Sequence, residues 1–374
     1  MKRLRQQSDH QINTKNKVMM LFLTIVFLGA IVLGLLFLIP GFTFPIKGQQ
    51  GHDVPRSIAS LEKVNLGGQE QWILIRGMDI TKPVILFLHG GPGTSNMCLL
   101  RKYTDELEQH FIVVTWDQRG AGKSYQAINP HSSMMIDRFV LDTGELTQLL
   151  CHRFDRQKIF LVGHSWGSLI GILSIQKYPD LYHAYIGIGQ IVNMQENEQI
   201  SYDWTLSQAT KAEDKRAIQT LTEIGTPPYT GDGQKKLMTQ RRLLGKYGGE
   251  LYGSSNGAFP LIFSSLICAT EYTLLDKVNF FKGIFASNSL LWQELLTINL
   301  NKQILSFEVP IYFVLGRHDY EAPSILAEQY FKIIEAPEKE MIWFENSAHF
   351  ANIEEDGKFD DLLIDRILPT IAII

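Results

Sequence analysis

The residues with the clearest chemical potential lie in Gly163-His-Ser-Trp-Gly167, which follows the apolar run 159–162 and precedes a helical pattern. A G-x-S-x-G pattern between a strand and a helix is typical of a nucleophile elbow, a sharp turn that exposes a serine hydroxyl. The glycines are needed because larger side chains beside the strained serine would clash with the sheet and the incoming helix. Ser165 is therefore the candidate nucleophile, and a glycine-rich turn with a structural serine is the alternative.

A serine hydroxyl becomes nucleophilic only beside a base, which is itself oriented by a carboxylate. On a scaffold with this elbow, the acid and then the histidine follow the serine along the chain, each in a loop beyond a late strand. Asp319 stands four residues past the apolar run 311–315, and His349 stands five residues past the run 341–344. We therefore expect Ser165, Asp319 and His349 to form a catalytic triad.

Other residues fit the acid and base roles less well. Glu321 and Glu345 lie near the candidate acid, but the Gly316-x-x-Asp319 spacing favours Asp319. Five other histidines lie before the fold, inside glycine turns, or at the wrong end of a strand for the base: His10, His52, His89, His164 and His318.

Serine attack on a carbonyl produces a tetrahedral oxyanion that needs two preorganised N–H donors. One donor is expected from Trp166, the residue after the nucleophile, and the other from the loop after the third strand. That loop reads His89-Gly-Gly-Pro-Gly93, which leaves its backbone accessible. We assign the N–H of Gly91 as the second donor, with a turn chosen only for its geometry as the alternative.

Other motifs give no indication of a cofactor or a metal. Arg119-Gly-Ala-Gly-Lys-Ser124 ends like a phosphate-binding loop, but that motif requires glycine at position 117, where the chain has Asp117. No H-E-x-x-H or calcium-loop pattern occurs, and Cys98, Cys151 and Cys268 are too far apart for a zinc site or a disulfide framework. We expect no cofactor, no metal and three ordinary thiols.

The body that must position these residues is a large globular one. The chain has 374 residues, of which 45% are hydrophobic and 11% aromatic, with 35 basic and 39 acidic side chains. This composition excludes a disordered chain, and only three cysteines exclude a small disulfide-stapled protein. The small negative net charge gives no reason to expect nucleic-acid binding.

Short apolar runs alternate with longer mixed segments, which is typical of βαβ units. The stretch 191–305 breaks this alternation, because it has helical spacing and no convincing buried strand. The predicted fold is α/β, with a mostly parallel twisted sheet flanked by helices and interrupted by a helical cap. The expected strands are 58–66 and 71–76, joined in a hairpin by Gly67-Gly68, then 84–88, 111–116, 159–162, 184–188, 311–315 and 341–344; the expected helices include 136–152 and 166–178.

Residues 18–39 form a run without a charged side chain, long enough to cross about 30 Å of hydrocarbon. The run is too long for a cleaved signal peptide and no small-residue cleavage site follows it, although a cleaved signal is the alternative. Residues 1–17 carry five basic side chains and one acidic one, so the positive-inside rule places them in the cytoplasm. We expect a single-pass signal anchor in the cell membrane, with the catalytic domain outside.

Three motifs together resemble the proline iminopeptidase (prolyl aminopeptidase) branch of the α/β-hydrolases: His89–Gly93, Trp116–Ser124 and Gly163–Ser168. The resemblance covers about 57–190 and 305–370. It implies an α/β-hydrolase fold, the triad and oxyanion donors assigned above, and a helical cap that selects the substrate. The expected organisation is a cytoplasmic tail at 1–17, an anchor at 18–39, a linker at 40–56, the first part of the hydrolase core at 57–190, the cap at 191–305 and the second part of the core at 306–374.

Enzymes of this branch release an N-terminal residue, often proline, and hold its ammonium group with glutamates of the cap. Such a pocket is physically reasonable because a buried ammonium without a carboxylate is costly. Ala269-Thr-Glu-Tyr272 is similar to the second glutamate segment of the branch, which implies Glu271 as an amine ligand. The alternative for Glu271 is a solvated helix residue, and Tyr202-Asp-Trp-Thr205 does not match the Trp-x-x-Trp-Glu stretch of the branch.

The leading functional hypothesis is a membrane-anchored serine hydrolase that works through an acyl-enzyme, most simply an aminopeptidase on short peptides. A carboxylesterase or acyl hydrolase on small esters or amides is the alternative, because the triad alone does not distinguish the two. A non-catalytic extracellular binding protein on a hydrolase scaffold is a third possibility, since a fold by itself does not fix a function. The expected partners are a small-molecule or short-peptide substrate and the lipid bilayer around residues 18–39, with no nucleic acid.

Overall fold

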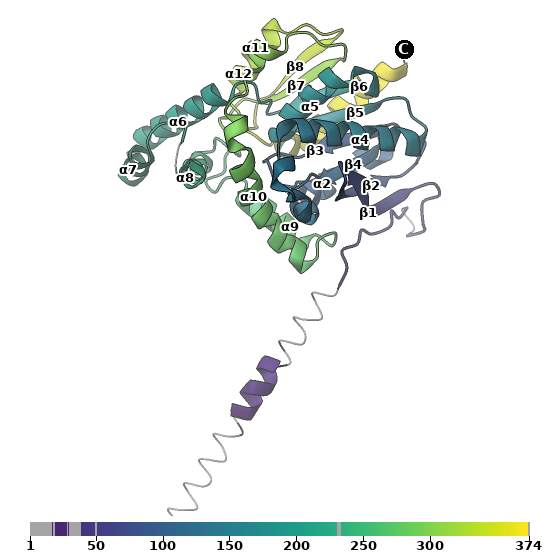
Figure 1. Ribbon diagram of the computed structural model, residues 1–374, viewed down its shortest axis with the longest axis horizontal. Coiled ribbons are helices and arrows are strands. Elements are labelled where there is room, and N and C mark those ends of the chain that lie inside the picture. The colour runs from purple at the N-terminus through teal and green to yellow at the C-terminus, as the bar shows by residue number, and fades with distance from the viewer. Residues whose placement is uncertain are drawn as a thin grey trace, which may run out of the picture.

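The computed structural model describes residues 17, 19–27, 29, 39–48, 51–229 and 233–372 (Figure 1). Most of the expected cytoplasmic tail, 1–17, and positions 18, 28 and 30–38 of the expected membrane anchor, 18–39, lie outside the described residues. Within these described ranges, none of the helices combines the length and the apolar character needed to cross a membrane.

In the part of the chain that the structure describes, eight strands form one sheet in the order β1-β2-β4-β3-β5-β6-β7-β8. The strands β1 and β2 form the predicted antiparallel hairpin, β2 is also antiparallel to β4, and every other neighbouring pair is parallel. The predicted α/β class is therefore confirmed. The strand bounds are β1 (Ile58–Leu66), β2 (Gln69–Gly77), β3 (Val84–Leu88), β4 (Ile112–Asp117), β5 (Ile159–His164), β6 (Tyr182–Ile188), β7 (Ile311–Gly316) and β8 (Lys339–Phe344).

The central strands are apolar along their whole length because helices cover both faces of the sheet. Side chains of one strand alternate between the faces, so Leu86 of β3 joins one hydrophobic cluster while Ile85 and Phe87 join another. The first cluster contains residues of α4 (Ile136–Phe154), α5 (Trp166–Lys177) and α12 (Ser324–Ile333). The second contains residues of α2 (Met97–Tyr103), α3 (Leu107–His110), α13 (Ala351–Glu354), α14 (Asp356–Asp361) and the π-helix η4 (Leu362–Ile367).

Short 3-10 helices complete the core around the sheet. They are η1 (Gly122–Ile128), η2 (His131–Ser133), η3 (Pro179–Leu181) and η5 (Leu368–Ala372).

Between β6 and β7 the described residues form six helices, which interrupt the sheet and lie beside its core (Figure 1). The two chain segments that enter and leave this cap meet at its base, where Asn193 and Asn299 form an isolated antiparallel bridge. The backbone N–H of Leu300 donates to the carbonyl of Val192 at 2.8 Å beside that bridge. The cap helices are α6 (Met194–Lys211), α7 (Lys215–Ile224), α8 (Gly233–Lys246), α9 (Phe259–Cys268), α10 (Leu274–Leu295) and α11 (Leu300–Gln303).

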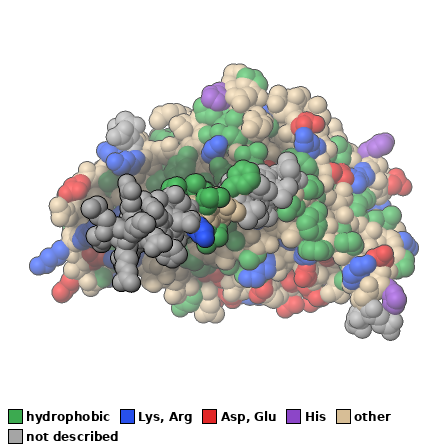
Figure 2. Space-filling model, turned by 90° about the horizontal axis from the view of Figure 1, so that it is seen from below, with side chains coloured by type: hydrophobic (Ala, Val, Ile, Leu, Met, Phe, Trp, Pro, Cys, Tyr) green, Lys and Arg blue, Asp and Glu red, His purple; other side chains and the backbone are tan. Residues whose placement is uncertain are grey.

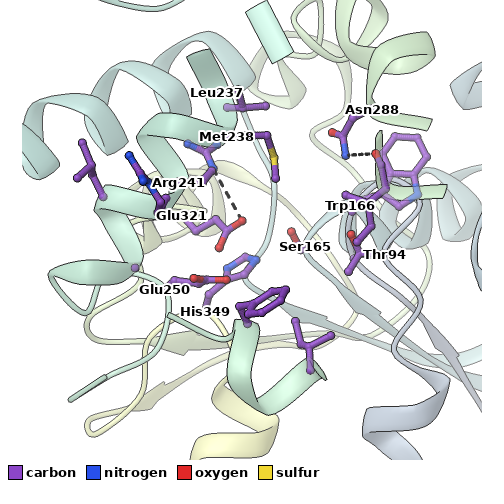
Figure 3. A pocket seen from close by; sticks show the side chains of 18 of the residues that line it. Thr94, Ser165, Trp166, Leu237, Met238, Arg241, Glu250, Asn288, Glu321 and His349 are labelled. Carbon is purple, nitrogen blue, oxygen red and sulfur yellow. Dashed lines mark hydrogen bonds and ion pairs between the residues drawn. The ribbon is translucent and has the colours of Figure 1, made fainter. Parts of the chain in front are cut away.

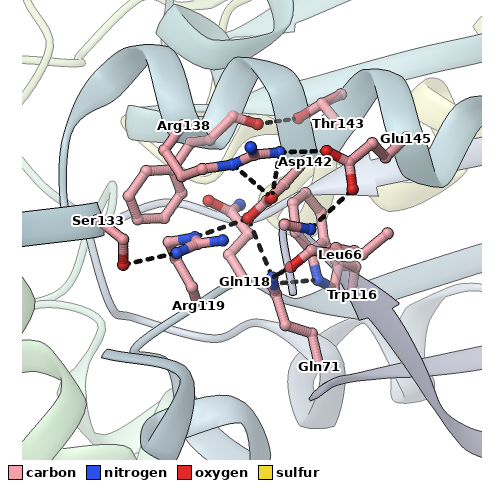
Figure 4. Close-up of polar contacts among 12 residues, drawn as sticks. Leu66, Gln71, Trp116, Gln118, Arg119, Ser133, Arg138, Asp142, Thr143 and Glu145 are labelled. Carbon is pink, nitrogen blue, oxygen red and sulfur yellow. Dashed lines mark hydrogen bonds and ion pairs between the residues drawn. The ribbon is translucent and has the colours of Figure 1, made fainter. Parts of the chain in front are cut away.

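A buried charged network holds the loop after β4 against helix α4 and the β1–β2 hairpin (Figure 4). Arg119 and Asp142 are both fully buried, and Arg119 Nε donates to Asp142 Oδ2 at 2.6 Å. Gln71 Nε2 donates to the same carboxylate oxygen at 3.0 Å, and Arg138 Nε donates to Oδ1 at 2.9 Å. Because every oxygen of this carboxylate is satisfied, the loop that carries the Trp116–Ser124 motif is fixed in place.

Candidate active site

Ser165 stands between the end of β5 and the first residue of α5, as a nucleophile elbow requires. Its backbone has φ +54° and ψ −121°, a strained conformation for a residue with a side chain. A Cβ added at Gly163 would collide with the carbonyl oxygen of Gly167, and one at Gly167 would collide with that of Leu88. The two glycines therefore allow the turn to pack tightly between β3 and α5.

Asp319 and His349 come from the loops after β7 and β8, and the structure brings them together. His349 Nδ1 lies 2.9 Å from Asp319 Oδ2, and both residues are almost fully buried. The other carboxylate oxygen of Asp319 accepts the backbone N–H groups of Glu321 and Ala322 at 3.0 and 2.9 Å. Because Asp319 is held in this way, the imidazole is fixed with Nδ1 toward the acid and Nε2 free for another partner.

Ser165 and His349 line the same cavity, which has a volume of about 860 Å³. Figure 3 shows the His349 ring between Ser165 and a group of carboxylates. Among the described residues, no hydrogen bond joins Ser165 Oγ to His349, a gap that is common in substrate-free enzymes and closes when substrate binds. Serine, base and acid thus share one site.

His164, the histidine inside the elbow, lines the cavity and also supports the base. Its Nε2 donates to the carbonyl of His349 at 2.8 Å, and the two ring centroids are 4.7 Å apart. Burial, followed by the charge on His349, lowers the pKa of His164 to about 3. A neutral, buried His164 therefore packs against His349 and orients its backbone.

The two expected oxyanion donors, Gly91 and Trp166, both line the cavity. Trp166 is the first residue of α5, so its N–H has no partner within the helix and is available to an oxyanion. Its indole Nε1 donates to Gln118 Oε1 at 2.9 Å, and Gln118 Nε2 donates to the carbonyl of His89 at 3.2 Å. The indole thus links the elbow to the loop that carries Gly91.

The position of Glu271 corrects its expected role as an amine ligand. Glu271 is buried between α9 and α10 and is not among the residues that line the cavity. Its carboxylate lies 3.8 Å from Arg101 Nε of α2, and its carbonyl accepts Lys123 Nζ at 2.8 Å. Glu271 therefore joins the cap to the core, because its side chain turns toward α2 and away from the cavity.

Three other glutamates line the cavity: Glu198 of α6, Glu250 of the loop after α8, and Glu321 of the loop after β7. Glu250 and Glu321 are close enough to His349 to raise its pKa. Glu198 Oε1 accepts a hydrogen bond from Arg241 Nη2, and Arg241 Nε lies 3.8 Å from Glu321 Oε1. Glu198 is 1% exposed, and its second oxygen has no partner among the described residues. One oxygen of the Glu198 carboxylate is therefore open to a further hydrogen-bond donor.

The backbone of Glu250 contacts the proposed base directly, since its carbonyl accepts the backbone N–H of His349 at 3.0 Å. Gly257 has φ +60°, and a Cβ there would collide with the Glu250 carboxylate, so only glycine fits beside it. Burial, followed by repulsion from Glu321, raises the pKa of Glu250 to about 8.

The same carboxylates act on His349. Burial lowers its pKa, but the negative charges of Asp319, Glu321 and Glu250 outweigh burial and raise the pKa to about 9. The substrate-free site therefore favours a positively charged imidazole at neutral pH. The cavity lining as a whole is mixed in charge, with Asp214, Glu198, Glu250 and Glu321 against Arg216, Arg241, Arg242 and Lys246, but the charges that raise the pKa of His349 are those of carboxylates.

Residue patterns could have pointed to one of these glutamates. Glu321 lies two residues after the proposed acid, Asp319, and from the sequence it is recognised only as an alternative for the acid role. Glu198 and Glu250 lie in the cap, where no pattern links them to residues of the core that are far away in the chain.

The rest of the cavity wall comes mainly from the cap and combines apolar side chains with charged ones. The apolar side chains include Met194, Leu237, Met238, Ile262, Trp292 and Phe350, and the charged ones are Asp214, Arg216, Arg242 and Lys246. In the described ranges, no group of three or more His, Cys, Asp or Glu side chains is arranged to hold a metal ion.

The sequence profile of the family described as "alpha/beta hydrolase fold" matches residues 83–356. The chain belongs to this family and is a hydrolase. Over 309 residues it is 37% identical to the "Probable aminopeptidase YbaC" of Bacillus subtilis, covering 82% of this chain and 96% of that protein. Over 99 residues it is 35% identical to a "Probable proline iminopeptidase" of Leptolyngbya boryana, covering 26% of this chain and 28% of that protein.

Solved structures share the fold at low sequence identity. The proline iminopeptidase of Mycobacterium smegmatis has a TM-score of 0.60 at 16% identity, covering 84% of this chain and all of that one. A proline iminopeptidase-related protein of Thermus thermophilus has a TM-score of 0.59 at 17% identity, covering 84% of this chain and 98% of that one. Together with the sequence relatives, they confirm the resemblance to this branch of the α/β-hydrolases.

Proposed function

We propose that this protein is a serine aminopeptidase that removes the N-terminal residue of short peptides. The observation that carries the proposal is the group of carboxylates, Glu198, Glu250 and Glu321, in the cavity that holds Ser165 and His349. A free N-terminal ammonium bound there would sit beside the base, with the first carbonyl of the peptide within reach of the serine. The similarity to a protein named as an aminopeptidase supports the same assignment.

In the proposed reaction, Ser165 Oγ attacks the carbonyl carbon of the first residue while His349 Nε2 accepts the hydroxyl proton. The N–H groups of Gly91 and Trp166 stabilise the oxyanion. The C–N bond breaks as His349 returns the proton to the leaving amine. Water, deprotonated by His349, then attacks the acyl-enzyme and releases the amino acid and Ser165. Asp319 orients the imidazole and stabilises its charged form throughout.

Substrate binding also prepares the base. An ammonium group placed among the glutamates cancels part of the negative charge that raises the pKa of His349. The pKa of the imidazole then falls, and the neutral form that can accept the serine proton becomes more populated. A substrate without a positive charge lacks this effect, so the site discriminates through reactivity as well as affinity.

Arg241 neutralises part of the negative charge of these glutamates. It already pairs with Glu198 and lies near Glu321, while Glu250 has no ion pair among the described residues. The Glu250 carboxyl group and the unpartnered oxygen of Glu198 are therefore the groups that we expect a single N-terminal ammonium to meet.

A panel of chromogenic substrates tests the proposal on the full chain. The panel contains an aminoacyl anilide, the same anilide with an acetylated amine, and a simple ester with no amine. We expect efficient hydrolysis of the free-amine anilide only, with loss of that activity in Ser165→Ala. Equal hydrolysis of the acetylated anilide, or a clear preference for the ester, would favour a carboxylesterase instead.

We also propose that residues 18–39 anchor the enzyme in the cell membrane with the catalytic domain outside. The proposal rests on the uncharged run and on the basic residues that precede it. Protease added to intact cells should digest the catalytic domain of the full chain. Protection of that domain until the cells are lysed would contradict the orientation.

A further inference from the structure

The cap has an apolar outer surface that the catalytic site does not use. On α9, Phe259, Phe263 and Ile267 recur every four residues and are 60, 42 and 52% exposed. This spacing places them on one side of the helix. The helix packs inward beside this stripe through Leu266, which belongs to a buried cluster with Met97. No charged residue occurs within α9.

Helix α10 carries a second apolar stripe. Leu275, Val278 and Phe285 are 53, 47 and 51% exposed, and their spacing is again helical. Lys282 lies between them in the same spacing and is exposed. The stripe therefore combines apolar side chains with a cation and no exposed acid.

The two stripes adjoin one another. Lys277 Nζ of α10 donates to the carbonyl of Ile267 at 2.7 Å, and the ring centroids of Phe263 and Phe281 are 6.5 Å apart. We call the exposed side chains of both helices the α9–α10 face: Phe259, Phe263, Ile267, Leu275, Val278, Lys282 and Phe285.

The N-terminal part of the chain reaches the body at this face. The N–H of Phe42 donates to the carbonyl of Thr270, in the connection between α9 and α10, at 3.0 Å. Ile39, Phe42 and Phe44 add exposed apolar side chains, 51, 44 and 57% exposed. Figure 2 looks onto the side from which the N-terminal segment leaves, and hydrophobic side chains gather there.

We propose that the α9–α10 face docks on the surface of a lipid bilayer. Exposed apolar side chains gathered on one face of a soluble domain mark an interaction surface. The uncharged run 18–39 ends three residues before Phe42, so a bilayer crossed by that run begins within about 10 Å of chain from this face. Lys277 and Lys282 suit lipid phosphates at the edge of the contact.

This docking rests on the proposed anchor and has a consequence for the enzyme. Phe259 belongs both to the face and to the lining of the cavity. Ile262, three residues further along α9, belongs to the lining alone. Docking therefore places one wall of the active-site cavity at the membrane surface.

Cys268, at the end of α9, provides a native probe. It is exposed, whereas Cys98 and Cys151 are buried. The full chain is labelled at Cys268 with an environment-sensitive fluorophore and reconstituted into phosphatidylcholine–phosphatidylglycerol vesicles. We expect its emission to shift to shorter wavelength, with quenching by nitroxide-labelled lipid and protection from aqueous iodide. A matched control carries Cys268→Ser and Gln329→Cys, which moves the label to α12 on a distant part of the body (Figure 1).

The outcomes separate this proposal from the anchor. Flotation with vesicles, but a Cys268 label quenched by iodide and not by the lipid nitroxide, would overturn docking while leaving the anchor intact. Failure to float with vesicles would overturn both. A blue shift without lipid quenching would mean that a second copy covers the face, which also overturns docking. The double variant Phe263→Glu, Ile267→Glu should still float but lose the shift, because both side chains are exposed and the fold does not depend on them.

Discussion

The backbone N–H of His349 donates to the carbonyl of Glu250 at 3.0 Å, which joins the loop of the proposed base directly to a loop of the cap. The carboxylate of Glu250 belongs to the group that receives the substrate amine in our proposal. The proposed amine subsite and the base are therefore linked directly through the backbone.

The triad is tested by three substitutions. Ser165→Ala, His349→Ala and Asp319→Asn should each lower turnover of a free-amine anilide by about 10⁴-fold, because each removes a member of one catalytic unit. Circular dichroism should show all three proteins folded. Wild-type turnover in any of them would remove that residue from the proposed triad.

The amine subsite is tested by Glu250→Gln and Glu198→Gln. Each variant keeps the size of the side chain but removes a carboxyl group that can pair with the ammonium, and at Glu250 the bound ammonium would favour the ionised form. The kcat/KM for the free-amine anilide should therefore fall by about 10–100-fold, the worth of a charge-assisted hydrogen bond. Glu345→Gln is the matched control, since Glu345 is an exposed partner of Arg317 outside the cavity. Equal losses in the control and the test variants would contradict an amine subsite.

The carboxylates near His349 should also affect how the reactivity of Ser165 depends on pH. Glu321 raises the pKa of His349 by favouring its charged form, so Glu321→Gln should lower that pKa. The reactive, neutral form of His349 then persists to lower pH, and the acid limb of the rate profile moves downward. The measurement is the rate of Ser165 labelling by an uncharged fluorophosphonate, which has no amine of its own to titrate. An unchanged or raised acid limb would show that Glu321 does not act on the base.

The buried network around Asp142 should contribute strongly to stability. Asp142→Ala leaves the fully buried Arg119 without its carboxylate, and we expect a loss of about 3–5 kcal/mol in the free energy of unfolding by urea. Asp137→Ala, on the same helix, removes an exposed pair with Lys177 and should cost less than about 1 kcal/mol. Similar losses in the two variants would contradict this role for the network.

Much of the core could be predicted from the sequence because its signals are local. Continuous apolar runs identify parallel strands that are buried on both faces, and Val84–Leu88 is observed with its predicted bounds. The strand β8 begins at Lys339, two residues before its predicted start, because it lies at the sheet edge where half-buried polar residues are tolerated. The elbow was predictable for the same reason, since G-x-S-x-G needs only its own turn and the elements on either side.

The cap could be recognised but its interior could not. Helical spacing in 191–305 predicts helices, yet it does not determine which side chains face the cavity. Glu271 and Glu250 illustrate the difficulty, since both are glutamates in connections between cap helices. The first turns toward Arg101 of the core, whereas packing around Gly257 directs the second into the cavity. Such choices depend on contacts between segments that are distant in the sequence.

The single bridge between Asn193 and Asn299 also bears on how such enzymes diversify. The cap between these two asparagines is connected to the sheet through the paired segments at its base. Substitutions inside the cap therefore need not disturb strand pairing. Evolution could therefore exchange or remodel the whole excursion as a cassette, acquiring new substrates while the chemistry beneath stays the same.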